Sequence, residues 1–179
     1  AFHPQSFVDD PTRIFRAGRY AARFGFTPDP QTLTWLEQGL PYLRQLSGER
    51  VKYDLELIFA EPEPERALAL LAGWDAFRAM AIPIPENEKL AQRFARIRAG
   101  RPAQVSVAQA GWGALMYHAN QLAAQRWLGL IPFDADTRDA LAELGPISIL
   151  SAQLFFADVK PSARHHLLEN FSVAGLWLA

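Results

Sequence analysis

The spacing of helix-breaking residues is the feature that most limits how this chain can fold. Proline and glycine recur throughout the 179 residues and leave only short segments between them. No segment shows the sustained apolar and polar alternation that a half-buried strand needs. Several segments instead place apolar residues at helical spacing. The sequence therefore predicts an all-α fold, an elongated helical bundle without a sheet.

Start and stop signals place the individual helices. Asp10-Pro11 and Asp29-Pro30 each join a capping carboxylate to a proline suited to a first helical turn, and Gly25 is a natural stop. Ser47 is expected to cap a helix that runs to about Phe59. The expected helices cover about 11–24, two short helices from 30 to 46 divided at Gly39 and Pro41, 47–59, 64–72, 87–99, 105–128 with an interruption near Gly111 and Gly113, 136–144, 147–157 and 161–172.

Composition sets the broad class of the protein. Half of the residues are apolar, so the chain can bury a core, and we expect the five tryptophans to lie in it. The segment Glu61-Pro62-Glu63-Pro64-Glu65 marks a soft boundary between two predicted units, 1–60 and 61–179. No apolar run approaches the roughly 18 residues that cross a bilayer, and Ala1-Phe2-His3-Pro4 lacks the pattern of a secretion signal. A cytoplasmic protein with no membrane contact is the expectation.

The net charge of −1 conceals an uneven distribution. Residues 87–128 carry six basic side chains and one acidic side chain. Local density of lysine and arginine, rather than the total charge, decides whether a surface can meet a phosphate backbone. An ordinary solvated helix face would show the same composition, so both interpretations stay open. The basic block consists of Lys89, Arg93, Arg96, Arg98 and Arg101.

The segment from Asp9 to Phe26 carries most of the functional information. At helical spacing its four arginines fall in one stripe, and Ile14, Phe15, Gly18 and Ala22 lie on the other side. Carboxylates accept from exocyclic amines, whereas guanidinium groups donate to ring nitrogens, carbonyls and phosphates. The segment therefore suits nucleotide recognition, although a solvated arginine face would have the same spacing. The stripe comprises Arg13, Arg16, Arg19 and Arg23.

The residue pattern of this segment resembles a family motif. Asp9-Asp10-Pro11-Thr12-Arg13 followed by Arg16-Ala17-Gly18-Arg19-Tyr20 is similar to the Glu/Asp-Asp-x-x-Arg and Arg-Ala-x-Arg-Phe/Tyr motif of class II CCA-adding enzymes, which are tRNA nucleotidyltransferases, and of bacterial poly(A) polymerases. Ser47-Gly48-Glu49-Arg50-Val51 with Asp54-Leu55 resembles the next motif of that family. The resemblance covers residues 4–60 and extends through Ala72. It implies the helical neck and body that follow the catalytic head.

The resemblance assigns roles to particular residues. It implies that Asp10 accepts from the exocyclic amine of an incoming CTP or ATP while Arg13 completes the pairing edge, so neither residue is catalytic. Asp9 stands where the family commonly has Glu and is expected to cap or orient. Arg16 is expected either to approach phosphate or the head, or to form an ion pair. The second motif supports the neck helices, which makes Glu49 and Arg50 structural.

The body of the resembled enzymes docks the acceptor and T arms of tRNA. The resemblance therefore implies that the basic block contacts RNA. The residues concerned are Arg93, Arg96, Arg98 and Arg101.

Polymerisation chemistry is expected to lie outside this chain. The family holds its Mg²⁺ ions on two carboxylates of a strand beside a Gly-Ser turn in the catalytic head, and neither is present here. Asp134-Ala135-Asp136 predicts a capped helix start rather than a metal site, and no His-Asp dipeptide occurs. His165-His166 is expected to be a surface pair, and with no cysteine we expect no metal and no cofactor in the chain.

Together these observations predict the RNA-binding and nucleotide-recognition part of a protein that extends RNA 3′ ends. The expected partners are tRNA at its 3′ end, and CTP or ATP together with the head. The intact protein is expected to be an enzyme and this chain alone to be inactive, consistent with a chain that begins partway through a longer protein. The alternatives are a stand-alone helical RNA-binding module and a helical interaction scaffold. The sequence does not distinguish CCA, CC, A or poly(A) addition.

Overall fold

A computed structural model describes residues 3–117 and 121–147, together with residues 168, 169, 171, 172, 175 and 177. Every regular element in these residues is helical, which confirms the predicted all-α class. The elements are α1 (Ser6–Asp9), α2 (Thr12–Phe24), α3 (Pro30–Gly39), the 3₁₀ helix η1 (Leu40–Gln45), α4 (Gly48–Phe59), α5 (Pro64–Gly73), α6 (Ala76–Ala79), α7 (Asn87–Gly100), α8 (Val107–Met116), α9 (Gln121–Leu130) and α10 (Ala135–Ala142).

The predicted caps are present at the helix ends. The Asp29 carboxylate accepts from the backbone N–H of Thr32 at 3.0 Å, and the Ser47 hydroxyl accepts from that of Arg50 at 3.4 Å. Gly25 ends α2 in the left-handed region, with φ of 67°, where a residue without a side chain is favoured. These signals set the boundaries of α2, α3 and α4 close to the expected residues.

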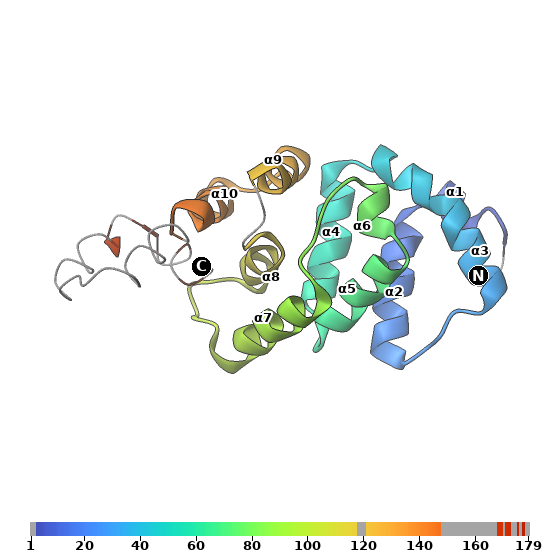
Figure 1. Cartoon of the computed structure of the whole chain (residues 1–179), viewed down its shortest axis with the longest axis horizontal. Helices are drawn as coiled ribbons and strands as arrows, with labels where there is room; N and C mark the ends of the chain where they lie inside the picture. Colours follow the sequence, from blue (N-terminus) through green and yellow to red (C-terminus); the bar gives the residue numbers. More distant parts are fainter. Residues whose placement is uncertain are drawn as a thin grey trace.

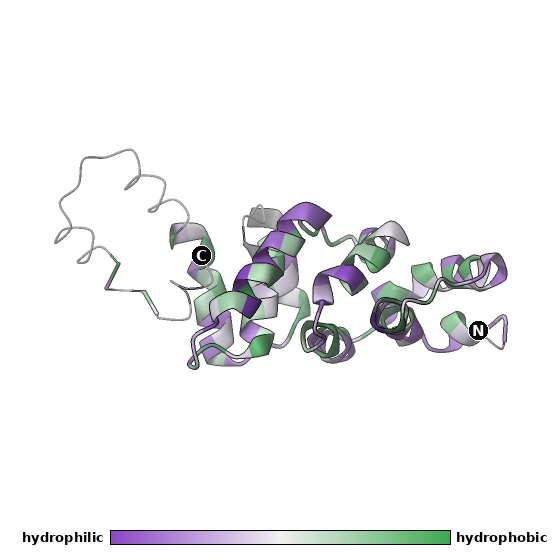
Figure 2. Ribbon diagram, turned by 90° about the horizontal axis from the view of Figure 1, so that it is seen from below, coloured by the Kyte–Doolittle hydropathy of each residue, from purple (hydrophilic) through white to green (hydrophobic). Residues whose placement is uncertain are grey.

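Helices α1 to α6 gather at one end of the molecule and α8 to α10 at the other, with α7 between them (Figure 1). Helix α2 packs on α4 and α5, α5 packs on α7, and α8 packs on both α7 and α4. Hydrophilic and hydrophobic residues occur together along helices of the molecule, as expected for amphipathic helices (Figure 2). Helix α8 differs, because every residue from Ala110 to Met116 is buried. The buried residues form one hydrophobic cluster that extends from Phe7 to Leu144.

Trp112 anchors the part of this core under α8. Its ring meets those of Phe59, Trp127 and Phe133 edge to face at centroid distances of 5.2, 5.4 and 5.1 Å. Its Nε1–H donates to the Glu56 carboxylate at 3.0 Å. Trp112 and Trp127 are fully buried as predicted, and the other three tryptophans are partly buried against the core.

The helix expected over 105–128 differs from the observed structure. Gly111 and Gly113 both lie inside α8, and the helix ends at Met116 instead. The structure accommodates glycine at position 111 of α8 because the absence of a side chain there lets the helix approach the Phe59 ring. The one-turn helices α1 and α6 were also not predicted. The helices expected over 147–157 and 161–172 lie almost entirely outside the described residues.

Among the described helices, none has the length and apolar composition that crossing a membrane requires.

Candidate functional site

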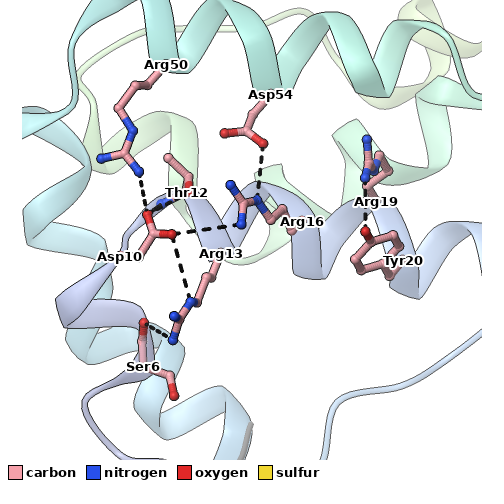
Figure 3. A network of polar contacts seen from close by, with 9 residues as sticks. All are labelled: Ser6, Asp10, Thr12, Arg13, Arg16, Arg19, Tyr20, Arg50 and Asp54. Carbon is pink, nitrogen blue, oxygen red and sulfur yellow. Dashed lines mark hydrogen bonds and ion pairs between the residues drawn. The ribbon is translucent and has the colours of Figure 1, made fainter.

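Asp10 lies in the bend between α1 and α2, where several donors surround its carboxylate (Figure 3). Its Oδ1 accepts from the Thr12 hydroxyl at 2.7 Å, from the Thr12 backbone N–H at 3.3 Å and from Arg50 Nη2 at 2.7 Å. Within the described part of the chain, its Oδ2 has two ion pairs, each at 3.9 Å, with Arg13 and Arg16, and no hydrogen bond. Because 3.9 Å exceeds hydrogen-bonding distance, Oδ2 is available to a further donor.

The surroundings of Asp10 favour its ionised form. Partial burial alone would raise the pKa of Asp10, but the hydrogen bonds from Thr12 and the positive charge of Arg50 outweigh it, and the pKa is lowered. Asp10 is therefore a carboxylate at neutral pH and can only accept hydrogen bonds.

Arg13 stands beside this carboxylate on the first turn of α2. Its Nη1 donates to the backbone carbonyl of Ser6 at 3.3 Å, and about half of its side chain is exposed. The structure thus brings together the two residues expected to read a base. A scaffold with an accidental motif would bury Asp10 and Arg13 in a structural pair. The exposed Arg13 guanidinium does not match that expectation.

The remaining arginines of α2 have carboxylate partners. Arg16 lies between Asp10 and Asp54, with its Nε at 3.7 Å from the Asp54 carboxylate. Arg19 and Arg23 share Glu61, at 3.8 and 3.6 Å. The stripe is therefore partly neutralised by acidic residues that the spacing within α2 could not indicate. Arg16 forms an ion pair, and its approach to phosphate stays a prediction.

Asp54 is buried behind this stripe, with 4% of its side chain exposed. Burial raises the pKa of Asp54, and the opposing charge of Arg16 lowers it only in part. Asp54 belongs to the second motif. Its ion pair with Arg16 and the hydrogen bond from Arg50 to Asp10 are therefore both contacts between the two motifs.

Arg50 is the site residue whose contact the sequence did not reveal. It was expected to be structural within the neck, yet it reaches back 40 positions to bond Asp10. The order of the two motifs along the chain was the only available signal, because their contact depends on how α4 packs against α2.

The four arginines expected to bind RNA have different environments. Arg98 forms a bidentate ion pair with Glu65, in which Nη1 and Nη2 donate to the two carboxylate oxygens at 2.9 and 2.8 Å. Arg93 donates to the Ala114 carbonyl at 2.6 Å, and Arg101 donates to the carbonyl of Val105. Arg96 is exposed. Of these four arginines, Arg93 and Arg96 line one cavity together with Tyr117 and Trp177, and Arg98 and Arg101 line another.

A second exposed surface lies at the far end of α2. Tyr20, Phe24 and Phe26 are exposed, and the Phe24 ring lies next to the other two, with centroids 6.1 Å from Tyr20 and 5.5 Å from Phe26. Arg19 and Arg23 lie over the first two rings. Sequence reasoning missed this group because helical spacing does not tell an exposed aromatic residue from a buried one.

The described residues do not fit a metal ion. No group of three His, Cys, Asp or Glu side chains among them could hold one. Asp134 instead caps α10 and accepts from the Thr137 backbone N–H at 2.8 Å. His165 and His166 lie outside the described residues.

Comparison with known proteins identifies relatives of part of this chain. Residues 25–85 match the family described as the probable RNA and SrmB-binding site of polymerase A. An A-adding tRNA nucleotidyltransferase of Geobacter sulfurreducens is 37% identical over 78 residues, which cover 42% of this chain and 9% of that protein. The mitochondrial CCA tRNA nucleotidyltransferase of Saccharomyces cerevisiae is 40% identical over 72 residues, which cover 37% of this chain and 13% of that protein.

Solved structures share the fold over nearly the whole chain. A CCA-adding enzyme in complex with ATP superposes with a TM-score of 0.76 at 20% identity, covering 98% of this chain and 44% of that one. A Thermotoga maritima CCA-adding enzyme in complex with tRNA superposes with the same TM-score at 20% identity, covering 99% and 45%. The comparisons confirm the resemblance to the neck and body region of class II tRNA nucleotidyltransferases. This chain spans less than half the length of these relatives.

Proposed function

We propose that this chain is the nucleotide-recognition and RNA-binding part of a protein that extends RNA 3′ ends with CTP or ATP. The observation that carries the proposal is the pairing of an ionised Asp10, whose Oδ2 has no hydrogen bond, with an exposed Arg13 beside it. Both residues belong to a motif shared with CCA-adding enzymes. The relatives that match are named as A-adding, CC-adding and CCA tRNA nucleotidyltransferases.

The chemistry of the pair accounts for the choice of base. Cytosine and adenine each present an exocyclic amine next to a ring nitrogen that accepts, whereas guanine and uracil present a carbonyl oxygen next to a ring N–H. A carboxylate beside a guanidinium complements the first pattern and opposes the second. Asp10 would accept from the amine and Arg13 would donate to the ring nitrogen. Mg²⁺ and the triphosphate chemistry would belong to a catalytic head.

Nucleotide binding by the chain tests this assignment. In NMR titrations with the four nucleoside triphosphates, we expect CTP and ATP to bind at least about fivefold more tightly than UTP and GTP, since a two-point base contact is worth about 1–3 kcal/mol. Asp10→Asn should abolish the discrimination, whereas Asp9→Asn, at the neighbouring exposed carboxylate, should preserve it. Equal binding of all four nucleotides by the unaltered chain would reject the base-reading role.

RNA docking is tested separately. Fluorescence anisotropy with a tRNA transcript and a duplex DNA control, measured across salt concentrations, should show salt-sensitive binding that favours tRNA. The absence of a tRNA preference at low salt would reject docking by this part of the protein. It would favour an interaction scaffold.

A further inference from the structure

Arg93 is a partly buried guanidinium with no carboxylate partner in the described part of the chain. Its Nη1 donates to the carbonyl of Ala114 in the last turn of α8, and its charge lies over the Tyr117 ring, 5.3 Å from the centroid. Burial lowers the pKa of Arg93 because water solvates its charge incompletely. A guanidinium has five N–H donors, so most of the Arg93 donors have no acceptor among the described residues.

Arg96 lines the same cavity one helical turn further along α7. No hydrogen bond or ion pair within the described residues holds its exposed side chain. The cavity has a volume of about 60 Å³, several times the roughly 10–15 Å³ that one water molecule requires. Its described lining residues supply two guanidinium groups, apolar side chains and the aromatic rings of Tyr117 and Trp177, and none of these residues is a carboxylate.

Arg98 has a different environment only two residues away. Both of its terminal nitrogens bond the Glu65 carboxylate on α5, so its charge is already matched. The basic block that looked uniform in sequence is therefore not uniform: Lys89 and Arg98 have carboxylate partners, whereas Arg93 and Arg96 have none among the described residues.

We propose that Arg93 and Arg96 form a binding site for a backbone phosphate of RNA, with Tyr117 and Trp177 as its aromatic wall. Planar guanidinium groups bind phosphate oxygens through paired hydrogen bonds, and an anion here would supply the partner that Arg93 lacks. This inference rests on the proposed RNA-binding function and places its phosphate contact at one cavity between α7 and α8.

The test is Arg96→Gln, because no hydrogen bond or ion pair within the described residues involves this side chain. Binding to a tRNA transcript should weaken about tenfold, since a hydrogen bond to a charged group is worth about 1.5–3 kcal/mol. The slope of log K against log salt should fall by about 1. Arg93→Lys keeps the positive charge but loses the planar guanidinium group, and we expect it to weaken tRNA binding as well.

The double variant Arg98→Gln with Glu65→Gln is the matched control. It removes the charged pair that joins α7 to α5 without changing the net charge. Because Glu65 already matches the charge of Arg98, the affinity for tRNA should stay within about twofold of the original. If the unaltered chain binds tRNA and Arg96→Gln keeps its affinity and salt slope, the phosphate site is overturned while the proposed function stands. An equal loss of tRNA affinity in the control variant would also overturn the phosphate site. Failure of the unaltered chain to bind RNA would reject both proposals.

Discussion

Asp10 shows how one carboxylate can support the fold and still present an oxygen atom for the proposed base contact. Its two oxygens have separate partners: Oδ1 holds the start of α2 and the Arg50 side chain, while Oδ2 has no hydrogen bond. The structural bonds keep the group ionised and oriented without occupying the second oxygen. Preorganisation of this kind favours a defined pairing geometry because the carboxylate need not reorient when a base arrives.

The contact between Asp10 and Arg50 should be measurable as a coupling energy. In a double-mutant cycle of Asp10→Asn and Arg50→Gln, urea unfolding should give a coupling of about 0.5–1 kcal/mol, because half of the Arg50 side chain is exposed and water screens the pair. A cycle of Asp10→Asn with Glu49→Gln, the neighbouring residue on α4, is the control and should give almost none. Equal coupling in both cycles would contradict a specific contact.

The raised pKa of Asp54 predicts that the stability of the fold depends on pH. Its pKa is raised in the folded state, so the fold binds its proton more tightly than the unfolded chain does. The stability that this group contributes is fully present below its ordinary pKa and is lost as pH rises through the raised value. Ionised Asp54 therefore costs stability at pH 7, and Asp54→Asn should unfold at a higher urea concentration there.

The advantage of Asp54→Asn should shrink as pH falls toward 4, because the original carboxyl then takes up its proton. Urea midpoints of the two chains measured between pH 4 and pH 7 would show this convergence. A variant that is less stable than the original at pH 7 would mean that the ion pair with Arg16 outweighs burial.

At the scale of elements, Gly111 lets two helices approach closely. A Cβ atom at this position would overlap the Phe59 ring, whereas one at Gly73, in the last turn of α5, would meet nothing within 4 Å. Gly111→Ala should lower the free energy of unfolding by about 1–3 kcal/mol through overpacking. Gly73→Ala should be neutral or stabilising by up to about 1 kcal/mol, as alanine favours a helix. Thermal unfolding followed by circular dichroism compares them, and equal effects would contradict the packing role.

Helices with local start and stop signals were predictable from sequence, and those set by packing were not. The Asp29 and Ser47 caps act within three residues, so α3 and α4 begin where expected. Gly111 looked like a breaker because its low helix propensity is visible locally, while its contact with Phe59 is not. One-turn helices such as α1 and α6 have too few residues to show a period.

The same distinction holds for the candidate site. Asp10 and Arg13 were predictable because they lie three residues apart within one motif. Arg50 and Glu65 were not, because each meets its partner across helices that are distant in sequence. Counting charges along α7 therefore overestimated the number of unmatched arginines.

At the scale of the whole molecule, the question is whether the predicted units 1–60 and 61–179 behave separately. Pro64 is buried at the start of α5, and α5 packs on both α2 and α7. Arg98 adds an ion pair from α7 to the same helix. The hydrophobic cluster runs through this junction without a break, so a disturbance at α5 should reach both ends of the molecule.

Leu68→Ala tests this continuity. Leu68 is fully buried on α5, and truncating it should lower the free energy of unfolding by about 2–5 kcal/mol. Circular dichroism reports all helices, whereas the fluorescence of a variant that keeps only Trp127, with the other four tryptophans replaced by phenylalanine, reports α9. If the chain unfolds as one unit, Leu68→Ala should shift both transitions equally in that background. A fluorescence transition that stays in place while the dichroism transition moves would show that α9 unfolds independently of α5, which would contradict unfolding of the chain as one unit.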